Sequence, residues 1–190
     1  RQENELAERE RLITAIFNTA PSLIVLWDVR SGTVSYVNYT AAQVLGVKPE
    51  DILELKKEDL FGRIHSDDIE NVWEFIMKLL KTQDGEVLTH EYRYRKPSGE
   101  WRVFLSQDTV FERDENGKVI KTLNIIDDIT DRKFAERALR ESEERFRSAF
   151  NYAPIGIALV SPMGNWLKVN RALCEILGYT EDEFLATDFQ

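Results

Sequence analysis

Three neighbouring residues, His65, Ser66 and Asp67, are of the types that form a nucleophilic triad. Members of such a triad converge from separate segments of a chain, whereas residues adjacent in sequence seldom face one another in this way. Ser66, Asp67 and Asp68 are also typical of a helix start, where the helix dipole favours acidic side chains. We therefore interpret His65 as a loop residue before a capped helix, and we predict no catalytic residue.

Paired carboxylates occur at Glu143-Glu144 and at Asp127-Asp128, in a predicted linker and at a predicted strand end. Neighbouring residues of a strand point to opposite faces, so general acid–base catalysis by such a pair is disfavoured. The sequence has no glycine-rich phosphate loop and no spacing typical of metal ligands. We expect a chain that is not an enzyme and that binds no metal.

Charge and hydropathy disfavour several classes of partner. The net charge of −9 argues against nucleic acid and anionic lipid. The longest apolar run, residues 23–27, is far shorter than the ~20 residues that span a bilayer, so we expect no membrane segment. The single cysteine, Cys174, excludes a disulfide framework within the chain and favours a reducing, cytoplasmic location.

An internal repeat organises the sequence. The segment Phe17-Asn18-Thr19-Ala20-Pro21 recurs as Phe150-Asn151-Tyr152-Ala153-Pro154, and further matches follow after a slip of one residue. These further matches are Gly32 with Gly164, Asn38 with Asn170, and Leu45-Gly46 with Leu177-Gly178. We predict an N-terminal linker helix at residues 1–17, a complete domain at 18–130, a linker helix at 131–149 and a partial second copy at 150–190, with both ends cut from something longer.

Hydrophobic periodicity and turn signals predict the elements of the first copy. Strands are expected at 23–27, 33–37, 87–95, 101–112 and 118–127, with two short helices and one long helix between the second strand and the third. Runs of strands on either side of a helical insert favour an antiparallel sheet with helices on one face. The predicted fold class is α+β, with a five-stranded antiparallel sheet, a helical insert on one face and amphipathic linker helices at its flanks.

This order of elements, together with local motifs, resembles the PAS domain family. The motifs are Tyr36-Val37-Asn38, Leu45-Gly46, His65-Ser66-Asp67-Asp68, the turn at residues 96–101, and Asp128-Ile129-Thr130. The last of these matches the triplet that closes a PAS domain and opens a signalling helix. Asp128 or Thr130 can cap that helix, so the resemblance implies that Asp128, Ile129 and Thr130 relay a signal from the sheet.

The resemblance also bears on cofactors. Haem-binding members use a histidine on the long helix, and residues 67–82 contain none; we expect no haem. Members that form a covalent flavin adduct need a cysteine in the helical insert, and residues 54–64 contain none, while Cys174 aligns with Ala42. We therefore predict no cofactor, although a non-covalent flavin or another small ligand stays open.

A set of apolar and aromatic side chains could line a ligand pocket, although side chains at this spacing more often form a plain core. The candidate face comprises Ile24, Leu26, Tyr36, Val72, Ile76, Tyr92 and Phe104. A shift of one residue in strand parity would exchange half of these positions.

The linker at 131–149 carries Ala135, Leu139, Ser142, Phe146 and Ala149 at alternating spacings of four and three, which indicates a heptad seam. Leu6 and Ile13 have the same spacing before the first copy. We predict a homodimer through Leu6, Ile13, Leu139 and Phe146 and through PAS faces; the alternative is a helix that packs on its own sheet.

Two functions are consistent with the sequence. The first is a sensory and protein-interaction module that passes a signal through its linkers to an output domain in the same protein, which the resemblance implies to be a cyclic-dinucleotide cyclase or phosphodiesterase or a histidine kinase. The second is a photo- or redox-receptor with a non-covalent flavin or another small ligand.

Overall fold

The computed structural model describes residues 2–187 of the chain. Arg1 and residues 188–190, which belong to the expected first helix and to the expected second copy, lie outside the described residues. The chain divides into two compact units, Arg1–Lys133 and Phe134–Gln190. A five-stranded sheet forms the first unit and a two-stranded sheet the second.

The sheet of the first unit is antiparallel throughout and has the strand order β2-β1-β5-β4-β3. Its strands are β1 (Leu23–Asp28), β2 (Thr33–Val37), β3 (Leu88–Arg95), β4 (Trp101–Arg113) and β5 (Val119–Asp128). Gly99 and Gly117 have φ angles of 91° and 79° in the turns after β3 and β4, a conformation that glycine adopts without a steric penalty. These turns set the hairpin order that the sequence predicts.

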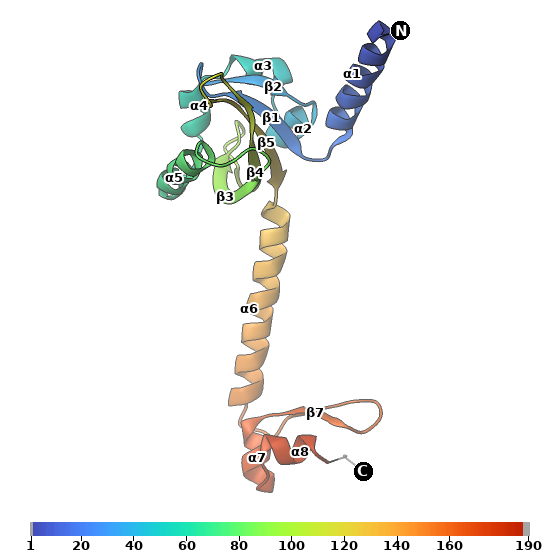
Figure 1. The fold of residues 1–190 in the computed structure, drawn as a ribbon. Helices are drawn as coiled ribbons and strands as arrows, with labels where there is room; N and C mark the ends of the chain where they lie inside the picture. The colour runs from blue at the N-terminus through green and yellow to red at the C-terminus, as the bar shows by residue number, and fades with distance from the viewer. Residues whose placement is uncertain (1, 188–190) are drawn as a thin grey trace. The chain divides into compact units, whose positions relative to one another are not determined.

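The chain between β2 and β3 forms the helical insert, which covers one face of the sheet (Figure 1). Its elements are α2 (Thr40–Leu45), α3 (Pro49–Glu54), α4 (Lys57–Phe61), a 3-10 helix η1 (Ser66–Asp68) and α5 (Ile69–Leu79). The buried core between insert and sheet consists of Leu23, Val34, Val37, Ala41, Leu45, Ile52, Tyr94 and Phe104. The α+β prediction, with five antiparallel strands and helices on one face, is confirmed.

Two long helices flank the elements of the first copy. α1 (Gln2–Thr19) precedes β1, and α6 (Thr130–Tyr152) follows β5. Ion pairs one helical turn apart, Arg137–Glu141 and Arg140–Glu144, lie on the exposed surface of α6. Such pairs add only a few tenths of a kcal/mol each, so they supply a small part of the stability of a helix of this length.

The second unit repeats the beginning of the first. After α6 come β6 (Ala158–Val160), β7 (Trp166–Val169), α7 (Arg171–Leu177) and α8 (Glu181–Leu185), in the order of β1, β2, α2 and α3. Thr180 starts α8 with a capping box, in which its hydroxyl accepts from the backbone N–H of Glu183 and the Glu183 carboxylate accepts from the backbone N–H of Thr180.

One fully buried asparagine joins the helix and the sheet in the first unit. The Oδ1 atom of Asn38 accepts from the N–H of Ile24 at 2.9 Å. Its Nδ2 donates to the carbonyls of Phe17 at 2.8 Å and Ser22 at 2.9 Å. We call this arrangement, with Asn38 bound to Phe17, Ser22 and Ile24, the asparagine clamp. It fastens the last turn of α1 to the first strand.

The same clamp recurs in the second unit at the aligned residue, Asn170. Its Oδ1 accepts from the N–H of Ile157 at 2.9 Å, and its Nδ2 donates to the carbonyls of Phe150 and Ile155, each at 2.9 Å. Phe150 lies in the last turn of α6, as Phe17 lies in the last turn of α1. The repeat in sequence is therefore a repeat in hydrogen bonding.

Candidate functional site

A cavity of about 390 Å³ lies between the sheet and the helical insert of the first unit. Small-molecule sites typically have volumes of ~300–1,000 Å³ and mostly apolar walls with a few polar groups. The wall here has that composition, and every strand of the sheet contributes to it. Its larger apolar and aromatic residues include Leu23, Val25, Trp27, Val34, Ile52, Leu60, Phe61, Val72, Trp73, Ile76, Tyr92, Tyr94, Phe104 and Ile126.

Four residues of the predicted ligand face, Val72, Ile76, Tyr92 and Phe104, lie in the cavity wall. Val72 and Ile76 come from α5, Tyr92 from β3 and Phe104 from β4, so the helical insert faces these two strands across the cavity. Phe104 is 1% exposed and stacks on Tyr94 with ring centroids 5.4 Å apart.

The other three predicted residues, Ile24, Leu26 and Tyr36, are not part of the wall. The expected parity of β1 is wrong by one residue, and an irregularity in the pairing of β1 with β2 puts Val34, and not Tyr36, on the cavity side. Leu26 and Tyr36 are cross-strand partners, so they share the opposite face of the sheet. The Tyr36 ring lies 5.9 Å from Phe17 of α1 on that face. Both faces of β1 are covered near its start, and the sequence of a strand covered on both sides shows no alternation.

A polar edge of five residues, which the sequence analysis missed, interrupts the apolar wall. It consists of His90 on β3, Ser106 and Asp108 on β4, and Thr122 and Asn124 on β5. Ser106, Asp108 and Thr122 are each at most 4% exposed. These positions share one strand face, because His90 pairs with Ser106 and Asp108 pairs with Asn124.

Hydrogen bonds organise the polar edge around Asp108. The Ser106 hydroxyl donates to Oδ1 of Asp108, and the Asn124 side chain also hydrogen-bonds to this carboxyl. His90 Nε2 lies 3.8 Å from Oδ2, beyond hydrogen-bond distance. The His90 ring is packed against Phe75, with ring centroids 3.7 Å apart. The histidine is thus held by stacking beside the carboxyl and not by a direct hydrogen bond to it.

Burial raises the pKa of the acid in this edge and lowers the pKa of the base. Desolvation raises the pKa of Asp108 to about 6, against the hydrogen bonds from Ser106 and Asn124, which favour the charged form. Desolvation lowers the pKa of His90 to about 4. The pKa of Tyr92 is raised by burial and by the Asp108 charge, so its hydroxyl stays protonated. At neutral pH a charged Asp108 therefore faces a neutral His90.

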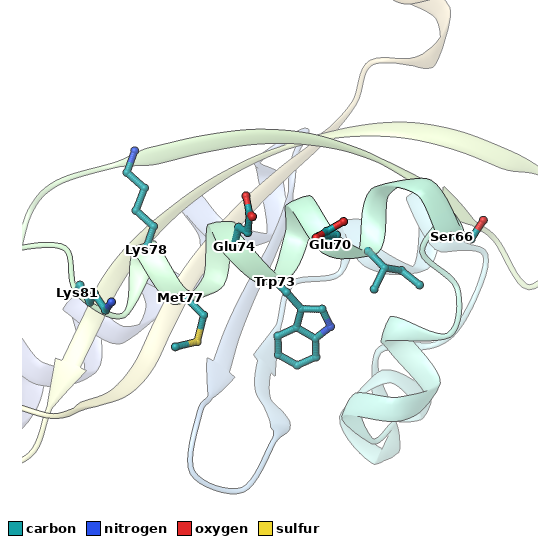
Figure 2. A pocket seen from close by; sticks show the side chains of 8 residues that line it. Ser66, Glu70, Trp73, Glu74, Met77, Lys78 and Lys81 are labelled. Carbon is teal, nitrogen blue, oxygen red and sulfur yellow. The ribbon is translucent and has the colours of Figure 1, made fainter.

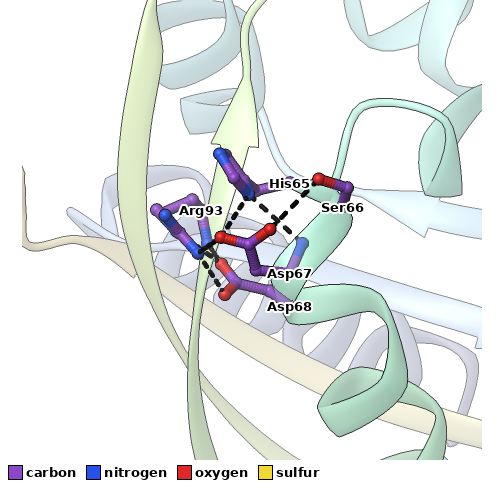
Figure 3. A network of polar contacts seen from close by, with 5 residues as sticks. All are labelled: His65, Ser66, Asp67, Asp68 and Arg93. Carbon is purple, nitrogen blue, oxygen red and sulfur yellow. Dashed lines mark hydrogen bonds and ion pairs between the residues drawn. The ribbon is translucent and has the colours of Figure 1, made fainter.

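The residues that could have formed a triad form instead a structural network, shown in Figure 3. Arg93 of β3 donates from Nε and Nη2 to the two oxygens of Asp68, at 2.9 and 2.7 Å, and this guanidinium holds the pKa of Asp68 below its usual value. His65 Nδ1 accepts from the backbone N–H of Asp67, while the Ser66 hydroxyl points to Asp67 and not to His65. The network fastens the start of α5 to β3.

The start of α6 is bound to the sheet by two consecutive residues. Ile129 N–H donates to the carbonyl of Val103 at 2.9 Å, and the N–H of Val103 donates to Thr130 Oγ1 at 2.9 Å. The Thr130 hydroxyl and N–H both donate to Asp128 Oδ1, at 2.5 and 3.0 Å. We call this arrangement of Val103, Asp128, Ile129 and Thr130 the helix cap. Val103 directly precedes Phe104 of the cavity wall.

Within the described residues, no group of three or more histidine, cysteine or acidic side chains is placed to hold a metal ion. Cys174 lies in α7 of the second unit, whereas the cavity belongs to the first. None of the described helices has the length and apolar character that crossing a membrane requires.

Comparison with protein-family models decides the family. A model of the PAS fold matches residues 34–126, and a model of the PAS domain matches residues 144–190. The chain belongs to the PAS family. The first segment contains Asn38 and the second contains Asn170, so the asparagine of each clamp lies in a matched PAS sequence.

Solved PAS structures resemble the chain in fold. A sensory box histidine kinase/response regulator from Burkholderia thailandensis superposes with a TM-score of 0.57 at 25% identity, over 71% of this chain and 97% of that chain. The PAS domain of an HTR-like protein from Haloarcula marismortui superposes with a TM-score of 0.53 at 22% identity, over 67% of this chain and 98% of that chain.

Curated relatives are sensors and a cyclase. The probable diguanylate cyclase DgcE of Escherichia coli is 49% identical over 57 residues, 30% of this chain and 5% of the relative. The two-component sensor PprA of Pseudomonas aeruginosa is 25% identical over 198 residues, 99% of this chain and 21% of the relative. The PAS chain thus spans only 5% and 21% of the length of these two relatives.

The four predicted seam residues of this PAS chain are all exposed. The exposed fractions are 60% for Leu6, 51% for Ile13, 62% for Leu139 and 49% for Phe146. Phe146 also stacks on Phe150, with ring centroids 5.5 Å apart, so part of its surface is used inside the second unit.

A surface groove runs along the outer side of α5, as Figure 2 shows. The residues that line it are Ser66, Ile69, Glu70, Trp73, Glu74, Met77, Lys78 and Lys81. Trp73 and Met77 also belong to the wall of the inner cavity, and Trp73 stacks on Phe61 of α4 at 4.9 Å. These two side chains therefore separate the cavity from solvent on this side.

Proposed function

We propose that this PAS chain is the sensory region of a signalling protein, in which the state of the cavity is passed to α6 and through it to an output domain. The cavity has the size and apolar character of small-molecule sites. The relatives include a two-component sensor, a sporulation kinase and a probable diguanylate cyclase. We infer an output domain of the histidine kinase class or of the class that makes or degrades cyclic dinucleotides.

The observation that carries the proposal is the position of Val103. Its carbonyl accepts from the N–H of Ile129 and its N–H donates to Thr130 Oγ1. The next residue, Phe104, is almost completely buried in the cavity wall. A change in the volume that Phe104 occupies displaces the β4 backbone at this point, because closely packed interiors transmit displacement. That displacement acts on the hydrogen bonds that start α6.

A double-mutant cycle between Phe104→Leu and Thr130→Val tests this relay. The readout is hydrogen exchange in the first turn of α6, including Lys133, whose N–H donates to the carbonyl of Ile129. We expect a coupling free energy of about 0.5–1 kcal/mol, since valine keeps the shape of threonine and removes both hydroxyl bonds.

Val110→Ala is the matched control for Phe104→Leu. Val110 is buried on the same strand, at 7% exposure, and does not line the cavity. Its effect should add to that of Thr130→Val without coupling. If the Phe104 and Thr130 changes also add without coupling, the relay through the helix cap is wrong.

The domain organisation is part of the proposal: a linker helix at 1–17, a complete PAS domain at 18–130, a signalling helix at 131–149 and a partial second PAS domain at 150–190. In a homodimer, the exposed seam residues of α1 and α6 would pack against the same residues of a second copy of the chain. A helix with a partner on that side stays helical over a length that is marginal for an isolated helix.

Replacing Leu139 with glutamate tests the seam. Leu139 is 62% exposed, so the change should leave the monomer folded while it places charge at the centre of the seam. We expect sedimentation to show a weaker dimer, with a dissociation constant raised about tenfold or more. Ser148→Glu, on an exposed position of α6 away from the seam, is the control, and an equal effect of both changes would contradict the seam.

A further inference from the structure

The chemistry of the cavity wall limits which ligands it can take. Asp108 is its one acidic residue, and no lysine or arginine lines it among the residues that the structure describes. The nearest base, His90, is 3.8 Å away and neutral at pH 7, because burial lowers its pKa. The wall therefore holds one negative charge that no side-chain cation offsets.

The carboxylate of Asp108 is 4% exposed, so solvent does little to stabilise this charge. Ser106 and Asn124 donate to it, but a carboxylate has about four acceptor positions. A buried charge is costly unless it is paired and hydrogen-bonded. A ligand with a positive charge at this point gains both the ion pair and the remaining hydrogen bonds.

The rest of the wall suits an apolar body. Around the polar edge lie the rings of Trp27, Trp73, Tyr92, Tyr94 and Phe104. Aromatic faces attract cations as well as apolar groups, so they do not oppose a charged end at Asp108. A carboxylate or phosphate ligand would face Asp108 with a like charge and lose affinity.

We propose that the cavity binds a small organic monocation, a protonated amine with an apolar or aromatic body, whose ammonium group lies at Asp108. This inference rests on the proposed function, in which the cavity is the sensory site. The ammonium donates to Asp108 and lies beside the side chains of Ser106 and Asn124, and the body extends toward Trp27 and the insert.

The test is isothermal titration of the full chain at neutral pH with three indoles of one shape: tryptamine, tryptophol and indole-3-propionate. They differ only in an ammonium, a hydroxyl or a carboxylate at the end of the same side chain. We expect tryptamine to bind at least tenfold more tightly than tryptophol, and indole-3-propionate to bind most weakly. Hexylamine and hexanol repeat the comparison with an aliphatic body.

Asp108→Asn should reduce the preference for each amine over its alcohol to threefold or less. Glu112→Gln removes a carboxylate from the same strand, where it is exposed and paired with Lys121 at 2.6 Å, and should leave the preference unchanged. In the unmodified chain, nuclear Overhauser contacts from the methylene next to the ammonium should reach the Asn124 side-chain amide, a readout that does not depend on the folding of a variant.

Each contrary result has one meaning. If the alcohols bind as well as the amines, or if Asp108→Asn leaves the preference intact, the cationic class is wrong and small-molecule binding stands. If neither amine binds at millimolar concentration, the cationic class is also wrong. The relay itself is decided separately, by the coupling between Phe104 and Thr130, which needs no ligand.

Discussion

Replacing Asn38 with alanine is expected to lower the free energy of unfolding of the first unit by about 3–4 kcal/mol. The change removes three hydrogen bonds at a residue that is fully buried. It leaves the N–H of Ile24 and the carbonyls of Phe17 and Ser22 without these bonds. Each buried polar group left unsatisfied costs about 1–3 kcal/mol, and the cavity left by the amide adds to this cost.

Urea unfolding followed by tryptophan fluorescence gives the loss of stability, and hydrogen exchange shows where it arises. The last turn of α1 should exchange faster, because its carbonyl at Phe17 loses the clamp. Asn116→Ala, in the exposed turn between β4 and β5, is the matched control and should cost less than about 1 kcal/mol. Equal effects of the two substitutions would show that the clamp has no special importance.

Asp108→Asn and His90→Phe are expected to change the pH dependence of stability in opposite directions, by about 2 kcal/mol each between pH 7 and pH 4. The pKa of Asp108 is raised from 3.8 to about 6 in the folded chain. As the pH falls through this range, the folded state takes up a proton before the unfolded state does. This group therefore makes the protein more stable toward acid.

The sign for His90 is the reverse. Its pKa is lowered from 6.5 to about 4, so the unfolded state takes up the proton first as the pH falls. This group makes the protein less stable toward acid, and it nearly offsets Asp108 over the same pH range. Tyr92 and Tyr94, the other titratable groups of the cavity wall, stay neutral throughout, because burial raises the pKa of each hydroxyl.

Urea unfolding at about pH 7 and about pH 4.5 measures both effects as differences from the unsubstituted chain. Asp108→Asn should lose stability relative to that chain as the pH falls, and His90→Phe should gain it. Acidic groups elsewhere, such as Asp68 with its lowered pKa, contribute to all three proteins and cancel in the difference. A pH slope that neither substitution alters would rule out this compensation.

The order of strands and helices was predictable because local signals mark each turn. Glycines at residues 99 and 117 take up conformations that the turns require, and the strand between them, β4, begins with apolar residues in alternation, Trp101, Val103 and Leu105. The helix cap at Asp128 and Thr130 was also foreseeable, since a polar pair at a strand end is typical of a helix start.

The face of each strand was harder to predict. Leu23 and Ile24 are neighbours, and their exposed fractions are only 3% and 5%, so β1 is buried on both sides at that point and gives no alternation to read. On β4, the predicted ligand face included Phe104, but Ser106 and Asp108, which lie on the same face toward the cavity, are polar and were not expected there. The burial of those polar residues depends on the helical insert, which is far away in sequence.

The asparagine clamp has a consequence for how such proteins recombine. Asn38 and Asn170 donate to main-chain carbonyls of the preceding helix, those of Phe17 and Phe150, which every amino acid possesses. The domain supplies the asparagine side chain of this junction, and the helix supplies only a backbone carbonyl. These hydrogen bonds therefore do not depend on the side chains of the helix. A gene fusion that brings a new helix to this point keeps these bonds, so one sensor can be exchanged for another without redesigning the junction.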